Sequence, residues 1–131
     1  MKTILVDAVD TSIIENESGQ FVKFQEMFDL LETYENHKII VTNADDEQII
    51  NFGLDNVPYP VFTMKHNPDK TNPVYFETLL TEYVLTPEDV IYFEHNQDAV
   101  ESAESIGITS YFYDNELKDL DDLKMFLNEN L

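Results

Sequence analysis

Four places along the chain carry the residue types that transfer of a phosphoryl group requires. Asp7 and Thr42 each end a short apolar run, and Lys70 precedes a segment with helical spacing. Glu94 and His95 follow a further run that is rich in aromatic residues. A carboxylate can serve as a nucleophile or bind a metal ion, and a hydroxyl or ammonium group can hold a phosphoryl oxygen. Ligands gather at the carboxyl ends of parallel strands, so these side chains form one candidate site if the runs belong to one sheet.

Short β-rich runs alternate with amphipathic stretches along the chain, an order that is typical of an α/β fold with a parallel sheet. Strands are predicted at 3–6, 38–42, 61–64, 90–93 and 109–113. Helices are predicted at 21–34, 45–52, 73–84, 97–106 and 119–127, and the polar stretch 10–20 is predicted to form a loop or a small hairpin. We therefore expect a single domain over residues 1–131, a three-layer, doubly wound, Rossmann-like α/β fold with a parallel sheet of about five strands.

The balance of charge argues against several classes of function. The chain has 27 acidic residues against 7 basic ones, a net charge of −20, and each basic residue is a lysine. A chain this acidic repels polyphosphate backbones and anionic lipid surfaces, so we expect it to bind neither nucleic acid nor a membrane. The absence of cysteine removes disulfides, thiolate metal sites and cysteine nucleophiles. No apolar run is long enough for a signal peptide or a membrane span, so a cytoplasmic location is expected.

The order of these residues resembles that of the haloacid dehalogenase (HAD) superfamily over essentially the whole chain. In that family one strand ends in a nucleophilic aspartate, the next ends in a hydroxyl residue, and a lysine precedes a later helix. The resemblance implies that Asp7 is the nucleophile, that Thr42 binds the phosphoryl group and that Lys70 completes the catalytic set. The stretch 90–107, which closes at Gly107, resembles the family's acidic motif. The resemblance also implies a HAD-like core, and the short spacings between these residues leave no room for a cap domain.

The same resemblance implies a magnesium site, but this sequence departs from the family at two positions. The metal ligands would be Asp7, the main-chain carbonyl of Val9, and Glu94, and His95 stands where the family's main magnesium-binding aspartate is found. An imidazole is a poor substitute there, because Mg²⁺ prefers oxygen ligands. Val9 also stands where the family has its general acid and base, and Asp10 comes one residue too late. Mg²⁺ is therefore expected as a cofactor only if the domain is active.

Three functions remain open at this point. The resemblance implies a HAD-like hydrolase domain, related to phosphatases through Asp7, whose two departures predict weak or lost activity. A site without a cap is open, so a phosphorylated or macromolecular substrate is expected. The alternative is a non-catalytic interaction or regulatory module that keeps the fold and docks a basic protein partner through its acidic surface. A third alternative is metal-independent chemistry through an ester of Asp7, as in the dehalogenase branch of the family.

Each candidate residue also has a structural explanation that involves no chemistry. Asp7 and Thr42 can simply end their strands, and Lys70 can be a surface lysine. His95 can be a hydrogen-bonded histidine at a strand end, and His66, in a polar connector, is expected to be solvated. Only the arrangement of these side chains in space separates the two kinds of explanation.

Overall fold

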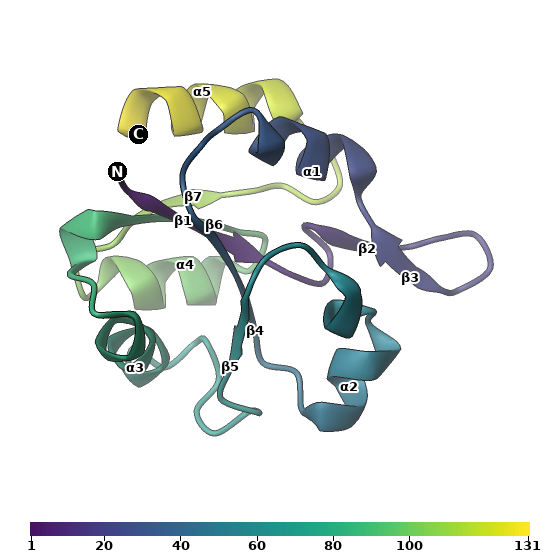
Figure 1. Cartoon of the computed structure of the whole chain (residues 1–131), viewed down its shortest axis with the longest axis horizontal. Helices are drawn as coiled ribbons and strands as arrows, with labels where there is room; N and C mark the ends of the chain where they lie inside the picture. Colours follow the sequence, from purple (N-terminus) through teal and green to yellow (C-terminus); the bar gives the residue numbers. More distant parts are fainter.

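A parallel sheet of five strands forms the centre of the molecule, in the order β5–β4–β1–β6–β7 (Figure 1). The computed structural model describes residues 1–131. The strands are β1 (Thr3–Asp7), β4 (Lys38–Thr42), β5 (Val61–Thr63), β6 (Val90–Glu94) and β7 (Thr109–Phe112). Each of them agrees with its prediction to within one residue at either end. β1, β4 and β6 are buried along their whole length because helices cover both faces of the sheet, which explains their continuous apolar runs.

Helices form the two outer layers of the fold. α1 (Gln25–Glu32) and α5 (Leu120–Asn130) pack on one face of the sheet, and α3 (Val74–Tyr83) and α4 (Gln97–Glu104) pack on the other (Figure 1). α2 (Asp46–Asn51) and the short helix η1 (Leu54–Asn56) follow β4, and a second short helix, η2 (Pro87–Asp89), precedes β6. Alternate residues of β1 point to opposite faces, so Ile4 and Val6 join the α1–α5 layer while Leu5 joins the α3–α4 layer.

The order of the strands places a crevice at the carboxyl edge of the sheet. The chain leaves β1 toward α1 on one face, and it leaves the neighbouring strand β6 toward α4 on the opposite face. The two connections therefore diverge above the ends of β1 and β6, the position at which doubly wound folds bind their ligands. This arrangement confirms the predicted three-layer α/β architecture. None of the helices combines the length and the apolar character that crossing a membrane would need.

A β-hairpin projects from the domain between β1 and α1 (Figure 1). It consists of β2 (Ile13–Glu15) and β3 (Phe21–Lys23), paired antiparallel through a turn in which Gly19 has a φ of 78°. The prediction that the helix begins at residue 21 is therefore wrong at its start, since α1 begins only at Gln25. Phe21 fits the aromatic spacing of a helix, but it lies in β3 and packs edge-on against Phe52, with ring centres 4.7 Å apart.

Short polar side chains start the helices that lead away from the crevice. At the start of α2, Asp45 accepts a hydrogen bond from the main-chain N–H of Gln48, and the Gln48 side chain accepts one from Asp45 in return. At the start of α4, Asn96 accepts a hydrogen bond from the N–H of Asp98 at 2.9 Å. Both helices therefore begin close to the ends of β4 and β6, and the side chains at these strand ends face the same space.

Candidate functional site

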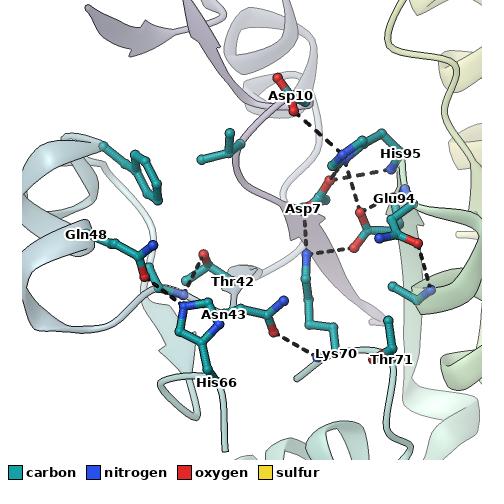
Figure 2. A pocket seen from close by; sticks show the side chains of 15 residues that line it. Asp7, Asp10, Thr42, Asn43, Gln48, His66, Lys70, Thr71, Glu94 and His95 are labelled. Atoms are coloured by element: carbon teal, nitrogen blue, oxygen red, sulfur yellow. Dashed lines mark hydrogen bonds and ion pairs between the residues drawn. The ribbon is translucent and has the colours of Figure 1, made fainter. Parts of the chain in front are cut away.

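The carboxyl ends of β1, β4 and β6 and the loop before α3 surround a pocket of about 240 Å³ (Figure 2). The residues predicted to form the site all line it: Asp7, Val9, Thr42, Lys70, Glu94 and His95. Figure 2 shows Asp7 joined to Lys70 and His95 by hydrogen bonds, with Thr42 on the other side of the pocket. The fold thus brings together side chains that lie far apart in the sequence.

Asp7 ends β1 and is 1% exposed. Its Oδ1 lies 2.5 Å from the ammonium nitrogen of Lys70, and its Oδ2 accepts a hydrogen bond of 2.6 Å from the hydroxyl of Thr11. The same Oδ2 lies 2.6 Å from Nδ1 of His95. Burial alone would raise the pKa of Asp7, but the charge of Lys70 and the hydrogen bond from His95 hold that pKa well below its usual range. The carboxylate is therefore ionised, and both of its oxygens already have donors.

Lys70 is a buried ion-pair partner, which rules out the alternative of a surface lysine. Its side chain reaches from the loop before α3 and pairs with Asp7 at 2.5 Å and with Glu94 at 2.7 Å. Burial opposes the charged form, but the two carboxylates outweigh it and raise the pKa of Lys70 above its usual value. The main-chain N–H of Lys70 donates to the side-chain oxygen of Asn43 at 2.8 Å, and this hydrogen bond ties the loop to the end of β4.

Glu94 ends β6 and is completely buried. Its Oε1 accepts hydrogen bonds from Lys70 and from the hydroxyl of Tyr92. Its Oε2 accepts from the N–H of Asn96 at 3.1 Å and lies 3.2 Å from Nδ1 of His95. Burial and the neighbouring charge of Asp7 raise the pKa of Glu94, although Lys70 opposes this shift. Tyr92 thus supports the site through its hydroxyl, a role that its place in an aromatic run does not reveal.

His95 stands over the two carboxylates with its side chain 26% exposed. Its Nδ1 faces Asp7 and Glu94, and its Nε2 lies 3.8 Å from Oδ2 of Asp10. The hydrogen bonds to Asp7 and Glu94 raise the pKa of His95 to about 10, against the effect of its partial burial. The ring is therefore an imidazolium at neutral pH. Lys70 and His95 therefore each lie against both carboxyl groups of the cluster.

The position two residues after Asp7 offers no group that can move a proton. Val9 lines the pocket with an apolar side chain. Asp10 has a φ of 70°, in the left-handed region that aspartate tolerates better than most residues. Its exposed carboxylate faces His95 rather than Asp7 (Figure 2). Asp10 therefore does not replace the general acid and base that the family has at the position of Val9.

Thr42 lines the opposite wall of the pocket, and hydrogen bonds with a buried tyrosine hold its main chain in place. The hydroxyl of Tyr75, buried in α3, accepts a hydrogen bond from the N–H of Thr42 at 3.0 Å and lies 2.8 Å from the carbonyl oxygens of Thr42 and Phe62. The Thr42 hydroxyl accepts a hydrogen bond from the N–H of Ala44 at 3.2 Å, so its own hydrogen is free to reach a ligand. The geometry is compatible with the predicted contact to an anionic group.

A second polar cluster lines the pocket opposite Asp7. Nε2 of His66 lies 2.8 Å from the side-chain oxygen of Gln48 (Figure 2). Its Nδ1 lies 3.1 Å from a carboxylate oxygen of Asp69. His66 is exposed, as its place in a polar connector predicts, with its side chain 47% accessible to solvent, and it also makes these two contacts. Nothing in the sequence pattern predicts this contact, since Gln48 and His66 belong to separate elements with no motif in common.

The residues present do not suit the magnesium ion that the resemblance implies. Nδ1 of His95 and one carboxylate oxygen each of Asp7 and Glu94 lie within 4.8 Å of one another, a spacing that a metal ion could join. Mg²⁺, however, requires nearly octahedral oxygen ligands, and here a nitrogen faces both carboxylates. Both oxygens of Asp7 and of Glu94 already accept hydrogen bonds from protein donors. An ion bound by these oxygens would have to displace protein donors.

Comparison with known proteins establishes the fold. No protein-family model and no curated protein matches the sequence. An uncharacterized protein from Listeria monocytogenes serotype 4b superposes with a TM-score of 0.72 and 12% identity, and the match covers 98% of each chain. A HAD family enzyme from Bacteroides thetaiotaomicron, solved with magnesium and inorganic phosphate, gives a TM-score of 0.64 and 9% identity over 86% of this chain and 93% of that one.

A third solved structure extends the comparison to a longer chain. A HAD-superfamily hydrolase of subfamily IA from Geobacter sulfurreducens PCA gives a TM-score of 0.56 at 18% identity, over 79% of this chain and 57% of that one. At these identities the likeness concerns the fold alone. The chain therefore has the HAD-like fold that the order of its residues predicts.

Proposed function

We propose that this chain is a HAD-like hydrolase domain, related to phosphatases through Asp7, in which phosphoryl transfer is weak or lost. The observation that carries the proposal is the apolar side chain of Val9 in the pocket, where a proton donor would be needed. Asp10, the nearest carboxylate along the chain, is engaged with His95 at 3.8 Å instead. The proposed domain keeps the nucleophile position and lacks the group that completes the reaction.

Losing the general acid and base affects both halves of an aspartate-based reaction. The leaving group would depart without a proton, and the water that hydrolyses an aspartyl phosphate would not be activated. Each such role contributes about 10²–10⁴-fold to the rate. Asp7 is also weakened as a nucleophile, because Lys70, Thr11 and His95 all donate to its oxygens. The expected hydrolysis of a phosphate ester is accordingly close to the uncatalysed level.

The open pocket bears on the substrate that any remaining activity would use. The additions to the α/β core are the β2–β3 hairpin and the segment that carries α2 and η1, and neither forms a cap domain. Without a cap, a small substrate remains exposed to water, whereas a large one closes the site with its own bulk. The proposal therefore favours a phosphorylated macromolecule over a small metabolite.

The experiment that tests the proposal measures hydrolysis of p-nitrophenyl phosphate in the presence of Mg²⁺. The wild-type rate is expected to equal that of the Asp7→Asn variant. The double variant Val9→Asp with His95→Asp is expected to gain a rate that adding Asp7→Asn removes. The matched control is the double variant Val22→Asp with His37→Asp, which adds two carboxylates outside the pocket. Its rate of hydrolysis should not rise. Robust wild-type turnover that Asp7→Asn abolishes would refute the proposal.

An interaction module is the second candidate, and one observation favours it. Lys65 and Asp46, 3.0 Å apart, form the one lysine–carboxylate pair on the surface, so most of the 27 acidic residues face solvent without a lysine partner. A surface of this kind can steer a basic protein toward the domain. A pull-down at low and at high salt tests this candidate, and failure to recover a salt-sensitive basic partner would count against it.

A further inference from the structure

One ring nitrogen faces both buried carboxylates of the pocket. We propose that the His95 side chain is a built-in replacement for a divalent cation, which closes the Asp7–Glu94–Lys70 cluster into a self-sufficient ion-pair network. The inference rests on the proposed function only in treating Asp7 and Glu94 as the carboxylates of a former metal site. It concerns binding and stability, and it holds whether or not the domain retains hydrolytic activity.

The ring nitrogen of His95 lies against both buried carboxyl groups. An ion shared by Asp7 and Glu94 would lie about 2.1 Å from one oxygen of each carboxylate. Nδ1 of His95 lies 2.6 Å from Oδ2 of Asp7 and 3.2 Å from Oε2 of Glu94, so the ring nitrogen faces one oxygen of each carboxyl group. The ring nitrogen and a shared ion therefore compete for the same space.

The remaining contacts hold the ring and the carboxylates in this arrangement. Lys70 donates to the other oxygen of Asp7 and of Glu94, at 2.5 and 2.7 Å. The main-chain N–H of His95 also points to Oδ2 of Asp7, at 3.4 Å, so strand and ring approach the same carboxylate. On the outer side, Asp10 lies 3.8 Å from Nε2 of His95. An ion could bind here only if the His95 ring moved away from Asp7 and Glu94 on its inner side and from Asp10 on its outer side.

The contacts around the two carboxylates lead to the same conclusion. Each carboxylate has the ammonium of Lys70 against one oxygen and Nδ1 of His95 against the other. A divalent ion added beside these two nitrogens would meet no oxygen of Asp7 or Glu94 that lacks a protein donor. Replacing His95 by aspartate removes one of these nitrogen partners and places a third carboxyl group beside the Lys70 ammonium. A divalent cation should therefore stabilise the His95→Asp variant, as the His95 side chain stabilises the wild type.

Thermal unfolding with and without Mg²⁺ provides the test. The wild-type Tm is expected to be the same in Mg²⁺ as in NaCl of equal ionic strength, which corrects for screening of the acidic surface. His95→Asp is expected to have a lower Tm in EDTA. Its Tm should rise by about 10 °C when Mg²⁺ reaches about 100 times its Kd. The matched control is His37→Asp, which places the same new carboxylate at an exposed histidine and should behave as the wild type does.

Two direct measurements keep the test decisive if His95→Asp does not fold. Titration of the wild type with Mn²⁺, followed by electron paramagnetic resonance, should show no tight site that Asp7→Asn removes. The ring Nδ1 proton of His95 should give the same NMR signal in EDTA and in Mg²⁺. The proposal is overturned if the wild type binds one Mg²⁺, Mn²⁺ or Zn²⁺ ion through Asp7, or if a folded His95→Asp variant acquires no Mg²⁺ site.

Discussion

Replacing Lys70 by methionine removes the cation that lies between the two buried carboxylates. Methionine keeps most of the side-chain volume, so the change concerns charge and hydrogen bonds more than packing. Asp7 and Glu94 each lose a contact of less than 3 Å and remain buried with His95 as their one cation. Removing one partner of a buried ion pair costs about 3–5 kcal/mol, because it leaves an uncompensated charge inside the protein. We expect the free energy of unfolding to fall by this amount at pH 7.

Urea unfolding at pH 7 measures the change directly, and thermal unfolding should show a Tm lower by about 10–20 °C. Lowering the pH should restore part of the free energy of unfolding that Lys70→Met loses. The pKa of Glu94 is raised in the folded protein, so its contribution to stability is greatest at low pH and is lost as the pH rises through that pKa. Removing Lys70 takes away a charge that lowers this pKa, so the deficit of Lys70→Met should shrink between pH 7 and about 5.

The matched control is Lys124→Met, which removes the same charge from an exposed site on α5. It should change the free energy of unfolding by about 0.5 kcal/mol or less. Adding Asp7→Asn to Lys70→Met should recover part of the stability, because one uncompensated carboxylate disappears. The reasoning is refuted if Lys70→Met costs no more than Lys124→Met, or if its deficit does not depend on pH.

Further variants test other contacts. The pKa of His95 is raised to about 10, so its contribution to stability is complete below pH of about 6.5 and is lost as the pH rises toward 10. His95→Gln should remove about 2–5 kcal/mol of that pH-dependent stability, measured by urea unfolding at each pH, and an unchanged profile would contradict the assignment. Tyr75→Phe leaves the main chain of Thr42 without a hydroxyl partner and should cost about 1–3 kcal/mol in urea, whereas no loss would show that the contact is dispensable. Asp119→Ala removes the cap that accepts from the N–H of Asp122 at the start of α5, and thermal unfolding followed by circular dichroism should detect a loss of about 1 kcal/mol.

The sequence predicts the strands well because a sheet covered on both faces requires continuous apolar runs. In β1, Ile4 and Val6 face one helix layer and Leu5 faces the other, so the strand needs apolar residues at consecutive positions. The hairpin is harder to predict. Phe21 fits a helical aromatic stripe as well as a strand, and its packing against Phe52 of the distant α2 segment decides between them.

The candidate site could be predicted in its residues but not in its hydrogen bonds. Lys70 looks the same in sequence whether it is a surface lysine or a buried partner of Asp7, because its burial depends on the loop before α3. Tyr92 and Tyr75 belong to apolar segments, so their hydroxyl contacts appear only once the neighbouring strand ends are placed. His95 could be identified as a departure from a metal-ligand pattern, but only the structure shows its ring between the carboxylates.

A crystal structure of the wild type grown with Mg²⁺ and a phosphate mimic shows whether the His95 ring or an ion lies beside the carboxylates of Asp7 and Glu94. We expect Nδ1 of His95 to remain within hydrogen-bond distance of Asp7 and Glu94, with no ion between the carboxylates. We also expect Val9 to present only its apolar side chain to the pocket. A magnesium ion bound by Asp7, Glu94 and the main-chain carbonyl of Val9, with the His95 ring displaced, would contradict these expectations.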